Sequence, residues 1–142
     1  MDDRSLPTDP EGLVRRRSAD GFAATLARLE AALGRHGLTI FARIDHAAAA
    51  RAVGLRLPPT VVFVAGAAKA GTPLMAERPW LAIDLPLRIL VREPEPGGAA
   101  EVAFNDPAWI VRRHGLADEA PEVSAMRGSL AAILTAATGW PA

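Results

Sequence analysis

The sequence predicts an α+β fold in which two longer amphipathic helices pack on one side of a mostly antiparallel sheet. Three observations support this prediction: short apolar runs bounded by turn residues, two longer segments with helical spacing, and a Pro/Gly-rich loop between the last two apolar runs. The chain has 142 residues, half of them hydrophobic, which is the size and composition of one globular domain. We expect residues 1–11 to form a flexible lead-in and residues 12–142 to form that domain.

The first part of the chain alternates between strand and helix patterns. Residues 12–17 predict a strand with a charged outer face. A helix follows, because four apolar residues recur at spacings of four, three and four: Phe22, Leu26, Leu29 and Leu33. Residues 38–44 predict a second strand, and Asp45 is typical of the cap of a short alanine-rich helix. Gly37 and Gly54 are typical helix ends.

The middle of the chain predicts a central strand and a short helical turn. Residues 60–65 are apolar on both faces, which favours a central position in the sheet. Residues 71–77 predict a helical turn with Thr72 as its cap and Pro73 at its first position.

The last part of the chain predicts two strands and then two helices. Residues 87–92 and 101–104 predict the fourth and fifth strands, joined by a hairpin loop. Asp106 and Pro107 open a short helix. A final helix from Pro121 or Glu122 to Thr138 places five apolar residues on one face: Val123, Met126, Leu130, Ile133 and Leu134.

The segment from Thr60 to Pro73 is the most suggestive motif. Its apolar strand runs into a Gly/Ala turn that holds Lys69, the only lysine of the chain. A nucleotide-binding P-loop is excluded, because Lys69 precedes the second glycine, Gly71, where that motif requires it to follow. Two interpretations stay open: a cradle of backbone N–H groups and Lys69 for an anion, or a plain turn at the end of a strand.

The pair Asp45-His46 also has two interpretations. Imidazole next to a carboxylate suits general acid–base catalysis, with His46 and Asp45 as candidate catalytic residues. Alternatively, Asp45 caps the helix that follows and His46 lies in its first turn. No metal is expected, because there is no cysteine and the histidines show no close ligand spacing: His36, His46 and His114.

Two further polar positions are candidates for the site, and the composition limits the classes of possible partner. Asp84 is either a turn residue or a buried carboxylate facing Lys69, and Asn105 precedes a helix opening. Sixteen acidic residues balance sixteen basic ones, so we expect no nucleic-acid or membrane partner. No apolar run is long enough to span a bilayer and the first residues are polar, which predicts a cytoplasmic protein.

Four ordered blocks resemble the bacterial "domain of unknown function 302" family: residues 37–55, 60–75, 81–91 and 104–116. The resemblance implies a TATA-binding-protein-like β-α-β4-α arrangement that is often dimeric, and no established activity. Carried over residue by residue, the pattern points to Asp45 and His46, then to Lys69, Gly71, Thr72 and Pro73, and on to Asp84, Leu85, Pro86, Asn105 and Asp106. The chain departs from the family at Ala67 and Ala68, where Asn and Pro are usual.

The function expected from these features is a non-enzymatic binding or regulatory module, a homodimer without a cofactor. Its pocket is expected where Asp45-His46 meets the 69–72 loop and holds a small anionic ligand. Two alternatives remain: an enzyme that uses His46 as acid and base, and a purely structural dimerisation domain.

Overall fold

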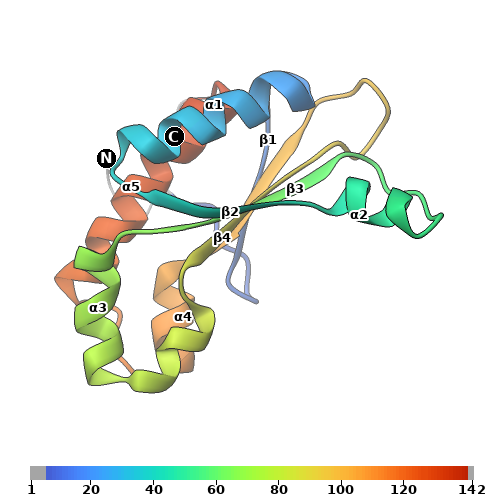
Figure 1. The fold of residues 1–142 in the computed structure, drawn as a ribbon. Helices are drawn as coiled ribbons and strands as arrows, with labels where there is room; N and C mark the ends of the chain where they lie inside the picture. The colour runs from blue at the N-terminus through green and yellow to red at the C-terminus, as the bar shows by residue number, and fades with distance from the viewer. Residues whose placement is uncertain (1–5, 141–142) are drawn as a thin grey trace.

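The computed structural model describes residues 6–140. Its elements follow the order β1 (Leu13–Arg17), α1 (Phe22–Arg35), β2 (Thr39–Asp45), α2 (His46–Ala52), β3 (Thr60–Gly66), α3 (Ala68–Glu77), the 3-10 helix η2 (Pro79–Asp84), β4 (Leu87–Arg92), β5 (Glu101–Asn105), α4 (Pro107–Arg113) and α5 (Pro121–Thr138). The α+β prediction is confirmed, because five antiparallel strands form a sheet with helices packed on one side of it (Figure 1).

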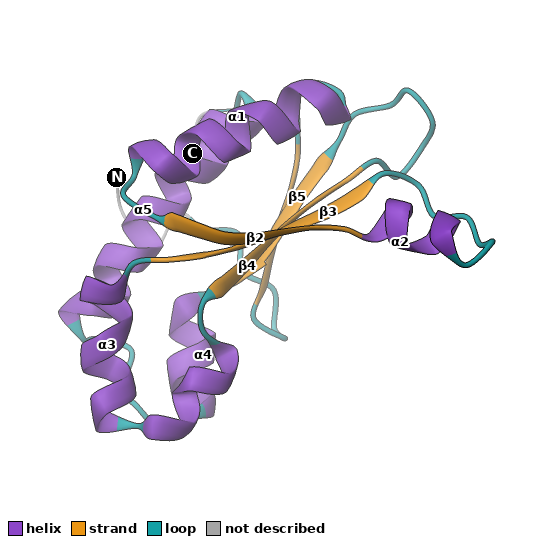
Figure 2. Ribbon diagram, in the orientation of Figure 1, coloured by secondary structure: helices purple, strands orange, loops and turns teal. Residues whose placement is uncertain are grey.

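The strands lie in the order β1-β5-β4-β3-β2, so β1 and β2 form the two edges (Figure 2). The predicted hairpin is formed, since β4 and β5 pair antiparallel on either side of the Pro/Gly-rich loop. The pairing of β2 with β3 shifts register between Ile40 and Ala42, which leaves Phe41 as the extra residue of a β-bulge. Bulges bend an edge strand and redirect a side chain.

One face of the sheet carries the core. In β3, Val61, Phe63 and Ala65 are buried, whereas Val62 and Val64 on the opposite face are half-buried. The prediction that β3 lies inside the sheet is right, since β2 and β4 flank it. The outer face of β3 is only half-buried, because the helices pack on one side of the sheet.

Two longer helices supply the other layer of the core, as the apolar spacing predicts. The side of α1 that faces the sheet buries Leu26, Leu29 and Leu33. Helix α5 packs against α1 and buries a longer apolar face: Val123, Leu130, Ala131, Ile133, Leu134 and Ala137. Among residues 6–140, no helix combines the length and the apolarity that a membrane crossing requires.

Helix α3 differs from the predicted helical turn. It starts at Ala68 and not after Thr72, and Pro73 lies inside it. The N–H groups of Ala70 and Gly71 both donate to the carbonyl of Ala67, at 3.0 Å, so they already belong to the first turn of the helix. Alanine is the strongest helix former, which explains why the helix begins earlier than the proline suggested. The 3-10 helix η2 that follows is not predicted from the sequence.

The start of the described chain is packed against the domain. Leu6 is buried in the core, and Thr8 forms an isolated bridge with Val14. A flexible lead-in therefore does not describe residues 6–11, while residues 1–5 lie outside the described part. Gly12 has a φ of +85°, and a Cβ at this position would lie 2.1 Å from Cγ of Trp109, so only glycine fits here.

Candidate functional site

Asp45 and His46 form a helix cap and the first residue of the helix. The Asp45 carboxylate accepts a hydrogen bond from the backbone N–H of Ala48 at 2.9 Å, and both Asp45 and His46 are exposed. Within residues 6–140 no hydrogen bond or ion pair of the His46 side chain is found. The capping interpretation therefore accounts for Asp45.

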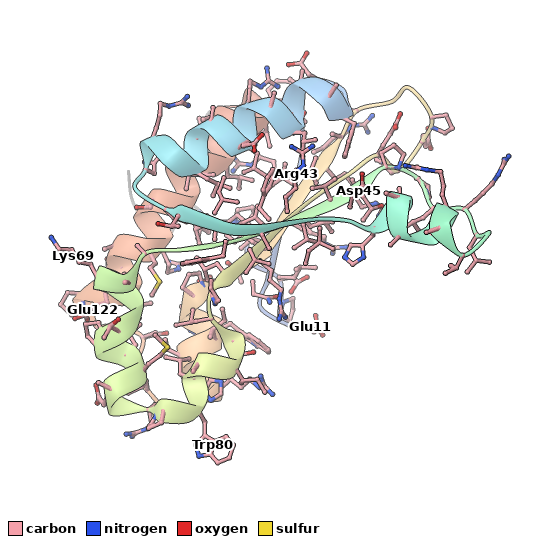
Figure 3. All side chains as sticks on the ribbon, in the orientation of Figure 1. Glu11, Arg43, Asp45, Lys69, Trp80 and Glu122 are labelled. Atoms are coloured by element: carbon pink, nitrogen blue, oxygen red, sulfur yellow. The ribbon has the colours of Figure 1, made fainter. Side chains whose placement is uncertain are left out.

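Lys69 lies at the opposite end of the sheet from this pair. In the β2–β3 ladder Asp45 pairs with Val61, whereas Lys69 follows the other end of β3 at Gly66. At about 3.3 Å per residue, the stretch of β3 between these two ends is roughly 17 Å long. Figure 3 shows Asp45 and Lys69 on opposite sides of the molecule. The predicted pocket between the two motifs is thus not formed, because antiparallel pairing places them at opposite ends.

Asp84 binds residues of α4 and not Lys69. Its Oδ2 accepts hydrogen bonds from His114 Nε2 at 2.6 Å and Arg113 Nη1 at 2.7 Å. Burial alone would raise the pKa of the Asp84 carboxyl, but the hydrogen bonds and charges of His114 and Arg113 outweigh burial, so the pKa lies below its usual value. The cluster ties η2 to α4, and within residues 6–140 no contact between Asp84 and Lys69 is found.

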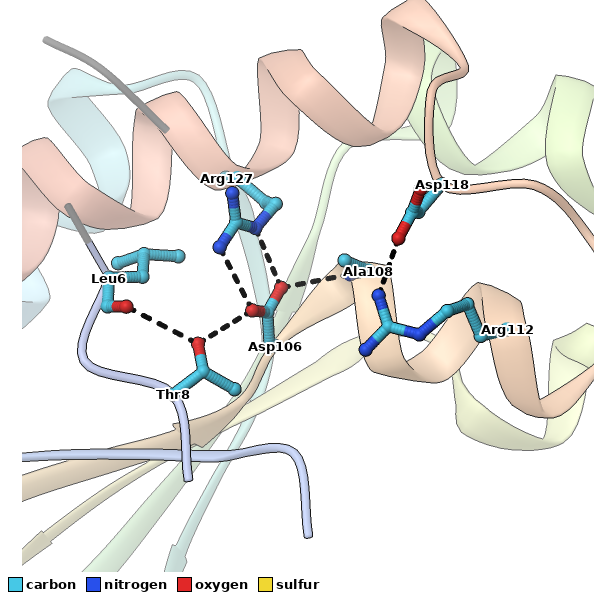
Figure 4. A network of polar contacts seen from close by, with 7 residues as sticks. All are labelled: Leu6, Thr8, Asp106, Ala108, Arg112, Asp118 and Arg127. Carbon is cyan, nitrogen blue, oxygen red and sulfur yellow. Dashed lines mark hydrogen bonds and ion pairs between the residues drawn. The ribbon is translucent and has the colours of Figure 1, made fainter. Parts of the chain in front are cut away.

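Asn105 is exposed at the end of β5, whereas the next residue, Asp106, is buried. The Asp106 carboxylate accepts hydrogen bonds from the Thr8 hydroxyl at 2.7 Å, the Ala108 N–H at 2.9 Å, and Arg127 Nε and Nη2 at 2.9 and 3.1 Å (Figure 4). Burial would raise the pKa of Asp106, but these bonds and the charge of Arg127 keep the pKa below its usual value. Asp106 therefore joins the N-terminal segment to α4 and α5 and has a structural role.

A pocket with a volume of about 390 Å³ lies between α3 and α5, at the end of the sheet where β3 finishes. Its lining is mostly apolar: Leu38, Phe41, Gly66, Ala67, Ala68, Ala70, Gly71, Met75, Ala82, Leu85, Pro86, Leu87, Ala125, Met126 and Leu130, with three polar residues, His36, Thr72 and Ser129. The volume falls within the range of about 300–1,000 Å³ that is typical of small-molecule sites.

Small residues on two facing helices shape this pocket. From α3 the lining receives Ala68, Ala70 and Gly71, and from α5 it receives Ala125 and Ser129, one turn apart. Short side chains leave space between two helices, so the volume remains open to a ligand.

The bulge of β2 supplies one rim of the pocket. Phe41 is 61% exposed, and a Cβ added to Gly66 would lie 3.9 Å from Phe41 Cε2. The bulge therefore directs an aromatic ring over Gly66, at the pocket. This arrangement could not be predicted from strand alternation, although the neighbouring apolar residues Ile40 and Phe41 are a signal of broken alternation.

Two of the five predicted ligand residues line this pocket and three do not. Gly71 and Thr72 line the pocket, whereas Lys69, Asp84 and Asn105 do not belong to its lining. Sequence reasoning missed the contribution of α5, and the signal that could have indicated it is the small pair Ala125 and Ser129 on an otherwise apolar helix face. Within residues 6–140 there is no cluster of three or more acidic or histidine side chains that could hold a metal ion.

The chain is similar to proteins named as fluoride channels. It is 39% identical over 105 residues to the fluoride-specific ion channel FluC 1 of Brucella suis biovar 1 (strain 1330), covering 74% of this chain and 41% of that protein. The same identity is found with FluC 2 of Brucella melitensis biotype 1 (strain ATCC 23456 / CCUG 17765 / NCTC 10094 / 16M), over 74% of this chain and 38% of that protein. The chain thus spans about two fifths of these curated relatives.

A solved structure shares the fold. The crystal structure of an uncharacterized conserved DUF302 protein from Bacillus stearothermophilus has a TM-score of 0.70, covers 90% of this chain and 96% of its own, and is 17% identical. Residues 14–137 match the family described as "Domain of unknown function DUF302". The resemblance that the sequence suggested is therefore confirmed, and this chain belongs to the DUF302 family.

Proposed function

We propose that the domain is a non-enzymatic binding module that holds a small, largely apolar molecule between α3 and α5. One observation carries this proposal: the pocket of about 390 Å³, whose side chains are apolar except for His36, Thr72 and Ser129. A concave site with a few polar groups in an apolar lining is the usual form of a small-molecule site.

The pocket also changes the ligand expected from the sequence. A site for a small inorganic anion needs several donors or cations, and no lysine or arginine lines this pocket. The amides of Ala70 and Gly71, which were expected to cradle the anion, donate to Ala67 inside α3. The apolar lining of the pocket therefore suits an apolar ligand better than a small inorganic anion.

A neutral dye tests this function. We expect the uncharged, polarity-sensitive dye Nile red to increase its fluorescence on binding, and Ser129→Phe to abolish the increase by filling the pocket. The matched control is Ser124→Phe, because Ser124 lies exposed on the same helix and does not line the pocket. If circular dichroism shows that Ser129→Phe does not fold, Ala125→Phe replaces it as the test, because Ala125 also lines the pocket. Equal dye fluorescence in the wild type and a folded pocket variant would refute the proposal.

A second candidate function is dimerisation, for which the arm formed by β2, α2 and the following loop provides an observation. Five large apolar side chains of this arm are exposed: Phe41, Ile44, Val53, Leu55 and Leu57. Figure 1 shows α2 projecting from the body of the domain. Contiguous exposed apolar surface is typical of protein interfaces. Sedimentation should give a dimer that the double variant Val53→Asp, Leu55→Asp converts to a monomer, and a wild-type chain that stays monomeric at high concentration contradicts it.

A third candidate is a role in the response to fluoride, at a place other than the α3–α5 pocket, which no lysine or arginine lines. Its support is the 39% identity with proteins named as fluoride channels, of which this chain matches only a part. If the domain senses the ion directly, sodium fluoride should raise its melting temperature more than sodium chloride does at equal ionic strength. Identical shifts in the two salts would count against direct sensing.

No observation favours an enzyme. His46 is exposed, the neighbouring Asp45 carboxylate caps α2, and the ladder places both at the other end of the sheet from the pocket.

A further inference from the structure

We propose that the ligand of the α3–α5 pocket is a carboxylic acid with a single apolar tail, bound with its carboxylate at the mouth and its tail inside. This inference rests on the proposed binding function and names the chemical class of its ligand.

The polar side chains of the lining lie on its more exposed part, together with exposed apolar residues such as Phe41. Thr72 and His36 are exposed and Ser129 is half-buried, whereas Gly71, Leu87 and Leu130 are buried. The groups able to form hydrogen bonds through their side chains therefore lie toward the solvent, and the floor offers only apolar contact. A molecule that matches this arrangement has one polar end and one apolar end.

The charge of the lining selects the kind of polar end. The lining contains no carboxylate, and its one titratable side chain is His36. Among the charged residues that adjoin the lining in sequence, Arg35 precedes His36, Lys69 lies between Ala68 and Ala70, and Asp84 precedes Leu85. The Asp84 carboxylate is already bound by Arg113 and His114. An ammonium head would find no acidic partner here, whereas a carboxylate can accept hydrogen bonds from the Ser129 and Thr72 hydroxyls and from His36.

The side chains around the middle of the pocket suit a flexible tail. Met75 from α3 and Met126 from α5 both line it, together with the half-buried Leu85. Methionine adapts its shape to its neighbours at little cost, so a linear alkyl chain can be accommodated without a rigid, shape-specific cavity. This favours an alkyl tail over a large planar ring system.

The experiment separates the head group from the tail. Nile red is displaced by decanoate, 1-decanol, decylamine or acetate, each below its aggregation concentration, and decanoate binding is also measured directly by calorimetry. We expect decanoate to bind about tenfold more tightly than decanol and decylamine to bind most weakly, since a charge-assisted hydrogen bond is about twice as strong as a neutral one. Acetate should not bind, because it has no tail.

Variants at the mouth provide the second arm. His36→Gln and Ser129→Ala should weaken decanoate binding several-fold more than they weaken Nile red binding, and the matched control Ser124→Ala should alter neither. If the dye binds in the pocket but acid and amine compete equally, or acetate competes as well as decanoate, the carboxylic-acid inference is overturned and the binding function stands. If the dye and decanoate do not bind, or if both bind equally well to a folded Ser129→Phe variant, the proposed binding function is refuted.

Discussion

Two regions of the molecule begin a helix with the same chemistry and have very different surroundings. At the end of β2, Asp45 caps α2 with a single hydrogen bond to Ala48 and stays exposed. At the end of β5, Asp106 caps α4 with a hydrogen bond to Ala108 of the same length, 2.9 Å, but its side chain is 3% exposed. Asp106 also binds Thr8 and Arg127, which come from distant parts of the chain.

This difference shows that the contribution of a capping residue to the free energy of unfolding depends on its surroundings in the fold and not on the capping motif alone. A helix cap contributes about 1 kcal/mol in either place, because its hydrogen bond is local. Of the two, only Asp106 carries a buried charge, and this charge is paired with the largely buried guanidinium of Arg127. Asp84 lies between the two, with a side chain that is 22% exposed and partners on one neighbouring helix.

The largest effect is expected for Asp106→Asn. The asparagine can still cap α4, but it removes the negative charge beside Arg127, whose side chain is only 14% exposed. Breaking a buried ion pair costs about 3 kcal/mol or more, so the free energy of unfolding should fall by about that amount. Urea denaturation at pH 7 measures it. If Asp106→Asn costs no more than Asp45→Asn, the two caps are energetically equivalent and the comparison fails.

The second effect is the pH dependence of stability, to which the carboxylates of Asp84 and Asp106 contribute. The pKa values of Asp84 and Asp106 are lower in the folded protein than the ordinary value of about 3.9, so their stabilisation is complete above that value. It is lost as the pH falls through the folded pKa values, because the unfolded chain binds protons first. Stability should therefore decline below about pH 4, and less steeply in Asp106→Asn and in Asp84→Asn than in the wild type. Urea titrations between pH 5 and pH 2 test this, and parallel curves for both variants and the wild type would contradict it.

A smaller effect is expected for Asp45→Ala. Loss of this exposed cap should cost about 1 kcal/mol or less and act mainly on α2, which has few contacts with the rest of the domain. Amide hydrogen exchange should show faster exchange at Ala48, with little change in α4. Unchanged exchange at Ala48 would show that the cap does not stabilise α2.

The smallest effect is expected for His46→Ala. His46 is exposed, and alanine is the better helix former, so the free energy of unfolding should change by less than about 0.5 kcal/mol. Nile red binding should also be unchanged, because the ladder separates His46 from the pocket. A loss of dye binding in this variant would show that His46 influences the pocket from the other end of the sheet, which would contradict this prediction.

Much of the fold could be predicted because its signals are local. The apolar spacing of α1 and α5, and the Asp caps of α2 and α4, all match the structure. Helix α3 is the exception, since the proline at position 73 suggested a later start than the alanines allow. The candidate site was predicted less well: Gly71 and Thr72 line the pocket, but His46, Lys69, Asp84 and Asn105 do not.

The sequence by itself determined where helices and strands form, because helical spacing, strand alternation and capping depend on neighbours a few residues apart. Only the tertiary structure decided which motifs meet. Antiparallel pairing of β2 with β3 places Asp45 and His46 at the opposite end of the sheet from Lys69. Asp84 forms a hydrogen bond with His114 and not with Lys69. The pocket arose from small residues on α3 and α5, which lie some fifty positions apart in the chain. No local sequence pattern indicates that these two helices face each other, because their proximity depends on how they pack on the sheet.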